Sequence, residues 1–165
     1  MEYKSNTKEL LAQLAIIRAN VAAGTFSDAL VAGLNAGMGA MKRRIFNQSL
    51  DAEGVSLGPY FSEQYERDRR QAGRQIGRKD LEMTGSLRRA IEIITVNQTA
   101  AQVRITNQQD AEKAAFQEQQ IYNLRNGLPA NEQNGQGVPI FEFNDEEWAI
   151  TKTTTRELLL QKLNF

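Results

Sequence analysis

A helix that is unusually rich in small residues limits the folds available to this chain. From Thr25 onward, six apolar residues recur with helical spacing: Phe26, Leu30, Leu34, Met38, Met41 and Ile45. Seven small residues lie between them: Ala29, Ala32, Gly33, Ala36, Gly37, Gly39 and Ala40. Glycine costs about 1 kcal/mol relative to alanine inside a helix, so these glycines need a compensating gain. We therefore predict that another helix or a sheet approaches this helix closely.

The N-terminal and central parts of the sequence predict one more helix and a hairpin. Residues 7–22 are expected to form a first helix, because five apolar residues recur there at helical spacing: Leu10, Leu11, Leu14, Ile17 and Val21. Leu87–Val96 and Ala101–Thr106 alternate between apolar and polar residues, as strands do. With a turn at residues 97–99, they predict an antiparallel β-hairpin.

The C-terminal half predicts a helix, a strand and a closing helix. A helix is expected at Asp110–Gln120, with an inward face formed by Ala111, Ala114, Ala115 and Phe116. Val138–Phe143 is predicted as a third strand. Asn144 is expected to cap the closing helix, and the acidic residues 145–147 at its positive end need no metal or acid–base role. Its buried side is predicted to contain Trp148, Thr151, Thr155, Leu158, Leu159 and Leu163.

Together these elements predict one α+β domain over residues 1–165, with N-terminal helices, a small antiparallel β-sheet with a hairpin, and a C-terminal helix packed on the sheet. Residues 60–79 are expected to form a polar arm or extended loop, and residues 123–137 a flexible loop. No apolar run approaches the roughly 20 residues that span a bilayer, and the N-terminus has no signal-peptide pattern. We therefore expect no membrane contact and synthesis in a cytoplasm.

The residue types that the sequence lacks exclude several kinds of functional site. The chain contains no cysteine, so it has neither a disulfide nor a thiolate metal site. It contains no histidine either, which removes the commonest general base, the commonest metal ligand and every histidine-activated nucleophile. Carboxylates, lysines and tyrosines remain. We therefore expect a protein that is not an enzyme, with no catalytic, cofactor-binding or metal-binding residues.

A basic segment, residues 67–79, is the candidate interaction site. The formal net charge of the chain is zero, with 20 basic and 20 acidic residues, but six cations gather here: Arg67, Arg69, Arg70, Arg74, Arg78 and Lys79. DNA phosphates, an acidic protein surface or solvent could each face such a segment. It contains no base-reading element, which favours solvent or a protein partner over nucleic acid.

Short motifs follow one another along the chain in a recognisable order. Arg43-Arg44-Ile45-Phe46 ends the glycine-containing helix, and Glu53-Gly54 and Pro59-Tyr60 follow it. After the basic segment come Asp80-Leu81-x-x-Thr84-Gly85-x-Leu87-x-x-Ala90-Ile91, then Val138-Pro139-Ile140-Phe141-Glu142-Phe143 and Asn144-Asp145-Glu146-Glu147. In this order the chain resembles the virion-morphogenesis and tail-completion proteins of tailed bacteriophages, which lie at the head–tail joint.

The resemblance implies a structural virion protein of the head–tail connector, or neck, or of the tail terminus. Such a protein would form a homo-oligomeric ring, a hexamer or dodecamer, that joins capsid portal and tail. Its partners would be other phage neck, portal or tail proteins, and it would be made in the host bacterial cytoplasm. Charge reversal at Arg69, Arg70 and Arg74 is then expected to block assembly. The alternative is a DNA-binding protein that contacts the packaged genome through residues 67–79.

Overall fold

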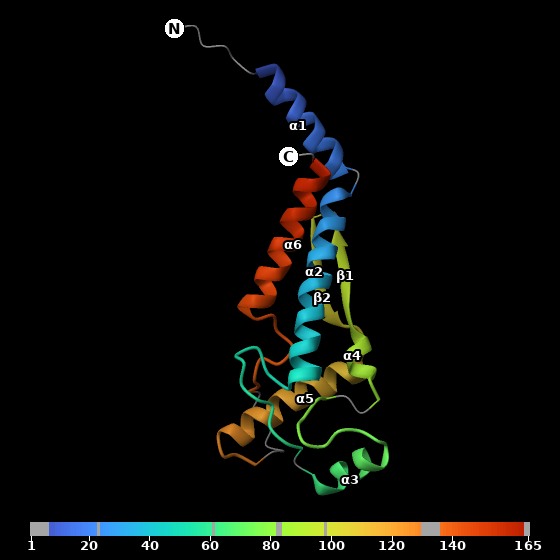
Figure 1. Cartoon of the computed structure of the whole chain (residues 1–165), viewed down its shortest axis with the longest axis vertical. Coiled ribbons are helices and arrows are strands. Elements are labelled where there is room, and N and C mark those ends of the chain that lie inside the picture. Colours follow the sequence, from blue (N-terminus) through green and yellow to red (C-terminus); the bar gives the residue numbers. More distant parts are fainter. Residues whose placement is uncertain are drawn as a thin grey trace.

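The long helix α2 (Thr25–Lys42) is the central element of the fold, and it continues into a wider π-helical segment, η1 (Arg43–Gln48). The computed structural model describes residues 7–22, 24–60, 62–81, 84–97, 99–129 and 136–163. Figure 1 shows α2 between the C-terminal helix α6 (Asp145–Leu163) and a β-hairpin. Gly24, with a φ of 78°, lies immediately before α2 and sets the turn between the first two helices.

Helices α2 and α6 run antiparallel and approach each other closely at two glycines of α2. A Cβ added at Gly33 would lie 2.0 Å from Thr155 Oγ1 and 2.6 Å from the carbonyl oxygen of Thr151. A Cβ added at Gly37 would lie 2.1 Å from Thr151 Oγ1. At Gly39 the nearest atom would be 3.9 Å away. The predicted close approach of a second helix is therefore confirmed at two of the three glycines.

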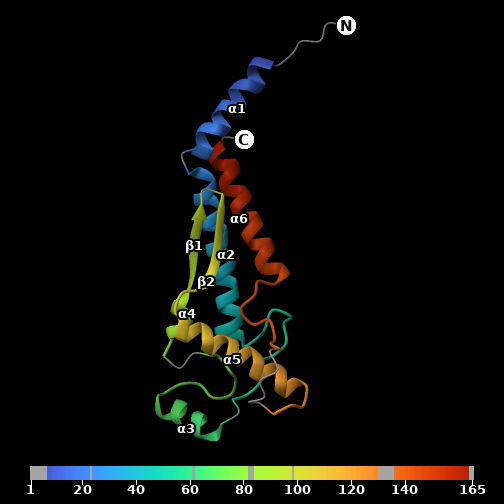
Figure 2. The ribbon, with the colours of Figure 1, turned by 180° about the vertical axis from the view of Figure 1, so that it is seen from behind.

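The predicted β-hairpin is confirmed. Strand β1 (Ile91–Asn97) pairs antiparallel with β2 (Ala100–Ile105), and Ile91 lies opposite Ile105. Residue 98, in the predicted turn, lies outside the described residues. Both strands contact α2 on the side away from α6, so α2 is covered on two sides. Figure 2 shows this arrangement from behind.

The start of the first strand was predicted too early. Residues 87–90 belong to a short helix, α4 (Ser86–Ala90), which follows Gly85 in a left-handed conformation with φ 73°. Leu87 and Ala90 are buried, three residues apart, as one helical turn requires. Leu87 also fits the alternation of Ile91 and Ile93, which is why periodicity alone assigned residues 87–90 to the strand.

Helix α5 (Gln108–Arg125) is longer than predicted at both ends and presents a different face to the core. Ala114 is buried as predicted, but Ala115 and Phe116, which were expected to point inward, are exposed. The helix crosses beneath the lower end of α2. It also occupies the first residues of the predicted flexible loop 123–137, of which residues 130–135 lie outside the described residues.

The prediction of a third strand at Val138–Phe143 is wrong, because this segment is an irregular loop. Its backbone groups bond to side chains and to isolated backbone groups of other segments instead of to a neighbouring strand. The N–H groups of Ile140 and Phe141 donate to the Glu118 carboxylate at 3.1 and 3.2 Å, and Pro139 has no N–H to offer. Burial raises the pKa of Glu118, opposed by these two hydrogen bonds.

One cluster of buried apolar side chains joins the lower end of α2 to η1, β1, α5 and the loop before α6. It contains Met41, Ile45, Phe46, Leu57, Leu87, Ile91, Ala114, Ile121, Val138 and Ile140. The predicted core position of Met41 is confirmed, and Met38 packs against the cluster. Trp148, predicted to be a core anchor, is 45% exposed.

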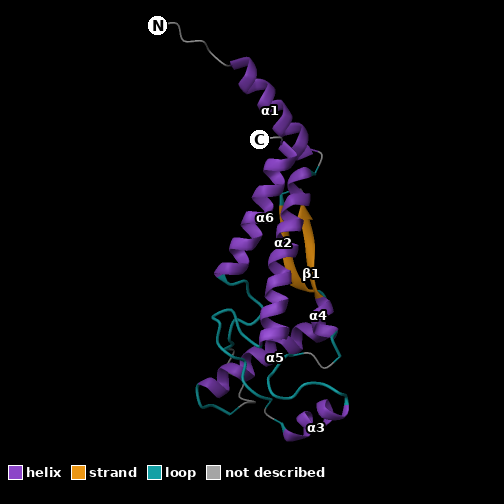
Figure 3. Cartoon of the chain, viewed as in Figure 1, coloured by secondary structure: helices purple, strands orange, loops and turns teal. Residues whose placement is uncertain are grey.

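Two helices lie at opposite ends of the elongated molecule, as the secondary-structure colouring in Figure 3 makes clear. Helix α1 (Thr7–Ala22) has the predicted bounds and projects beyond the C-terminal end of α6. Helix α3 (Glu63–Gln71) lies at the other end, within the predicted polar arm. The predicted α+β class is confirmed by the helices around the single described hairpin.

Candidate functional site

The basic segment is anchored to the rest of the protein by a buried ion pair. Arg69 has no exposed surface, and its Nη2 lies 2.8 Å from each carboxylate oxygen of Asp80. The Arg69 guanidinium also lies over the Tyr60 ring, 4.6 Å from the centroid. The Tyr60 hydroxyl donates to Asp80 at 2.6 Å. Arg69 therefore holds the arm in place and is covered by it.

Lys79 is also buried, unlike a surface cation. Its backbone N–H donates to the Gly58 carbonyl at 2.9 Å, and the Ser49 hydroxyl donates to the Lys79 carbonyl. Burial lowers the pKa of Lys79 to about 7, because a desolvated ammonium is disfavoured. Burial also raises the pKa of Tyr60, and the hydrogen bond to Asp80 adds to this shift.

Four of the six predicted interaction residues lie on the surface: Arg67, Arg70, Arg74 and Arg78. We refer to them as the exposed arginines. They share the arm with the exposed acids Glu63 and Asp68, so the surface carries both signs of charge. The structure therefore separates the basic segment into two inward-facing residues with structural contacts and four that can meet a partner.

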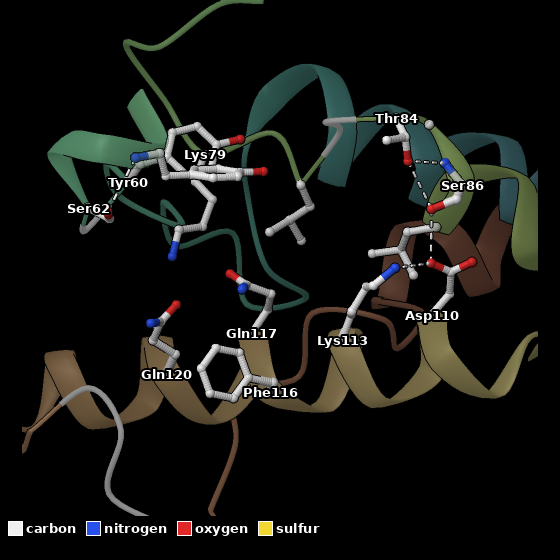
Figure 4. Close-up of a pocket in the computed structure, with 14 residues that line it drawn as sticks. Tyr60, Ser62, Lys79, Thr84, Ser86, Asp110, Lys113, Phe116, Gln117 and Gln120 are labelled. Carbon is white, nitrogen blue, oxygen red and sulfur yellow. Dashed lines mark hydrogen bonds and ion pairs between the residues drawn. The ribbon is translucent and has the colours of Figure 1, made fainter. Parts of the chain in front are cut away.

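A pocket of about 510 Å³ lies between the arm and α5. Its apolar walls come from Tyr60, Tyr65, Leu81, Leu87 and Phe116, and its polar lining includes Lys79, Ser86, Asp110, Lys113, Gln117 and Gln120. Figure 4 shows the Lys79 side chain extending toward Gln117 and Gln120 of α5. At the other end, Ser86 donates to Asp110 at 2.9 Å and Lys113 lies 3.3 Å from the same carboxylate. Asp110 is thus already engaged in structural contacts.

A second buried ion pair, Arg44–Glu147, ties α6 to the end of α2. Arg44 Nε donates to Glu147 at 2.8 Å, and both residues are almost fully buried. The same guanidinium donates to the carbonyls of Leu50, Ile140 and Glu142. One arginine therefore fixes the irregular loop before α6 and the segment after η1 to the helix pair.

Glu147 also takes part in the predicted cap of α6. Asn144 Oδ1 accepts from the Glu147 N–H at 2.9 Å, and the Glu147 carboxylate accepts from the Asn144 N–H at 3.0 Å. The cap is confirmed, but its ion pair with Arg44 was missed. The sequence did contain a signal for this ion pair. Arg44 follows Met41 by three residues and therefore lies on the apolar face of the helix, where a buried charge needs a partner.

Apolar side chains remain uncovered on α1 and α6. On α1, Leu11, Leu14 and Ile16 are 59%, 52% and 53% exposed. On α6, Trp148 and Leu160, at 39%, border a groove of about 460 Å³ between α6 and α2. A monomer that leaves such side chains on two neighbouring elements has surface suited to a partner.

Three further findings concern a metal site, a membrane-spanning helix and similarity to known proteins. Among the described residues, no three acidic side chains come together as a metal site would require. None of the described helices is long and apolar enough by itself to cross a bilayer, although residues 11–20 and 25–48, bent by 60°, reach that length and composition jointly. In comparisons with known proteins, no family model, curated sequence or solved structure matches this chain.

Proposed function

We propose that this chain is a structural virion subunit that forms an oligomeric ring, a hexamer or dodecamer, at the head–tail joint of a tailed phage. It would belong to the neck or to the tail terminus, join capsid portal and tail, and contact other neck, portal or tail proteins. In this role it has no catalytic task. The order of sequence motifs motivates the proposal, and the surface of the monomer supports it.

The observation that carries the proposal is the amount of apolar surface that one copy leaves uncovered. Helix α1 and the groove beside Trp148 and Leu160 together expose large aliphatic and aromatic side chains. Monomeric soluble proteins rarely expose contiguous apolar patches larger than a few hundred Å². A subunit that is completed by neighbours in a particle would have this kind of surface.

The charge of the arm supports a protein partner. Two of the exposed arginines, Arg67 and Arg70, lie on α3 among the acids Glu63, Glu66 and Asp68. Mixed charges of this kind set orientation and register at protein interfaces, whereas a DNA-coating surface is predominantly basic. The arm is also held rigidly by Arg69 and Asp80, so a partner would meet a preformed surface.

Charge reversal of the exposed arginines tests the proposed function. We expect Arg70→Glu with Arg74→Glu to leave the fold intact and to reduce the yield of complete particles in a phage that depends on this chain, with unjoined heads and tails counted by electron microscopy. Arg69 must be kept, because its loss would unfold the arm and make the result uninterpretable. Arg43→Glu with Arg104→Glu, at exposed positions outside the arm, is the matched control for the change in surface charge. A normal particle yield from the arginine variant would refute the role of the arm. A normal particle yield when the gene for this chain is deleted would refute the proposed role at the head–tail joint.

The alternative function is DNA binding, favoured by the presence of four exposed arginines within twelve residues of sequence. If all four neutralised phosphates, the logarithm of the affinity would fall with the logarithm of salt concentration with a slope of about −3.6. Fluorescence anisotropy with duplex DNA measures this slope. Absence of binding at low salt would remove the alternative.

A further inference from the structure

Helix α1 cannot be explained as part of the monomer. Every side chain described from Leu11 to Ala19 is exposed, on all sides of the helix. Figures 1 and 2 show α1 extending past the end of the α2–α6 pair, with no other element along most of its length. Among residues 11–22 the single charge is Arg18. Large aliphatic side chains such as Leu11, Leu14 and Ile16 are usually covered by protein, but here they are more than half exposed.

The groove between α2 and α6 is an apolar surface that could receive a helix such as α1. It is lined by Leu30 of α2 and by α6 side chains that recur every three or four residues: Trp148, Thr151, Lys152, Thr155, Arg156, Leu159 and Leu160. From Trp148 to Leu160 this stripe is about 18 Å long. The aliphatic residues of α1 from Leu11 to Ile17 span about 9 Å, so this part of α1 fits within the length of the groove.

The geometry of the chain directs α1 away from its own groove. The axes of α1 and α2 differ by a bend of 60° at the junction near Gly24. Helix α1 therefore continues beyond the end of the molecule instead of folding back along α6. A second copy placed end to end, related by a two-fold axis, would offer its groove to this helix.

The buried area favours reciprocal exchange. Along the ~18 Å of the groove, a helix ~10 Å wide would cover roughly 280 Å² with the half that faces it. The groove would lose a similar area, so exchange would remove roughly 560 Å² from each copy and about 1,100 Å² in total. Biological interfaces bury at least about 1,000 Å² in total, whereas insertion of one helix in one direction would bury about half of that.

We propose that two copies of this chain exchange α1, each helix lying in the α2–α6 groove of the other copy. Lys152 and Arg156 of α6 line the groove together with its apolar side chains. This pair uses the apolar surface that also carries the proposed function, but it is a property of the free protein. The mass of the free protein tests it separately from particle yield, so the failure of either proposal can be recognised by itself.

The mass of the full chain in solution tests the exchange. We expect a dimer by light scattering after gel filtration. Leu14→Lys in α1 and Leu160→Lys in the groove should each raise the dissociation constant about 30-fold or more, because each exposed leucine is lost from two symmetric contacts. Gln13→Lys and Thr153→Lys are matched controls on exposed positions of the same helices, outside the groove lining. Circular dichroism checks that all four variants remain folded.

Crosslinking identifies which chain occupies the groove. The chain has no cysteine, so Leu14→Cys in one copy and Lys152→Cys in another introduce one thiol each. Bridging of the mixed chains by a short bis-maleimide is expected. A wild-type monomer at all concentrations would overturn the proposal. So would bridging confined within a doubly substituted chain, or a monomer that binds phosphatidylcholine vesicles through α1.

Discussion

Replacement of Gly33 by alanine tests the closest contact in the fold. In an isolated helix the change would stabilise, because alanine is better than glycine by about 1 kcal/mol. Here the new methyl group would lie 2.0 Å from Thr155 Oγ1 and 2.6 Å from the Thr151 carbonyl oxygen. The hydroxyl can rotate away, but the carbonyl belongs to the backbone of α6. The whole helix must therefore move.

Two opposing effects determine how much Gly33→Ala changes the free energy of unfolding. Overpacking of a well-filled interface costs about 1–3 kcal/mol, and the gain in helix propensity offsets about 1 kcal/mol of it. We expect Gly33→Ala to lower the free energy of unfolding by up to about 2 kcal/mol. For a chain of 165 residues, this corresponds to a decrease in Tm of up to about 8 °C.

Gly39→Ala is the matched control, because it lies in the same helix and its added Cβ would meet nothing closer than 3.9 Å. It should raise the free energy of unfolding by about 0.5–1 kcal/mol. Urea denaturation followed by circular dichroism measures both variants, with equal slopes as the check that the same transition is observed. If Gly33→Ala stabilised the protein as much as Gly39→Ala, the close approach of α2 and α6 would be refuted.

Three further predictions concern buried ionisable groups, and urea denaturation measures each of them. Arg44→Met should lower the free energy of unfolding by about 3–5 kcal/mol, because it leaves Glu147 buried without its cation; a loss below about 1 kcal/mol would contradict this. The pKa of Glu118 is raised from 4.5, so the folded state binds the proton more tightly than the unfolded state. The free energy of unfolding should therefore fall as pH rises through the folded-state pKa. Glu118→Gln, which keeps an acceptor oxygen, should remove this dependence on pH. The pKa of Lys79 is lowered from 10.5 to about 7, so stability should rise between pH 7 and 10.5, and Lys79→Met should flatten this rise.

The sequence predicted the elements whose local signals agree with their tertiary contacts. Gly33 and Gly37 implied a close neighbour, and the structure supplies α6. Asn144 carried an N-cap signal, and its hydrogen bond to Glu147 confirms it. In both cases a few neighbouring residues are enough for the prediction. For α2 the signal is the cost of glycine inside a helix, and for α6 it is the residue type at the helix start.

Predictions were wrong where contacts distant in sequence decide the conformation. Val138–Phe143 has strand-like composition, but Arg44 and Glu118 bind its backbone in place of a strand. Trp148 is large and apolar, yet it points to the surface because Glu147 occupies the inward position beside it. Arg69, predicted as an interaction residue, is buried against Asp80 and Tyr60. Composition cannot identify such partners.

The two buried ion pairs and the exposed apolar helix lie in different halves of the molecule, and the two halves are suited to different kinds of contact. Arg44 and Arg69 hold irregular loops and the arm in the lower half, where few regular backbone hydrogen bonds are available. The upper half is regular but presents α1 and the α6 groove to solvent. Because buried ion pairs specify geometry more than they add stability, the lower half is suited to present a fixed surface. Because apolar burial is the main source of association energy, the upper half is suited to join copies. A partner that meets the exposed arginines would thus find the arm already ordered, whereas the exposed aliphatic side chains of α1 would be covered only when a second copy arrives.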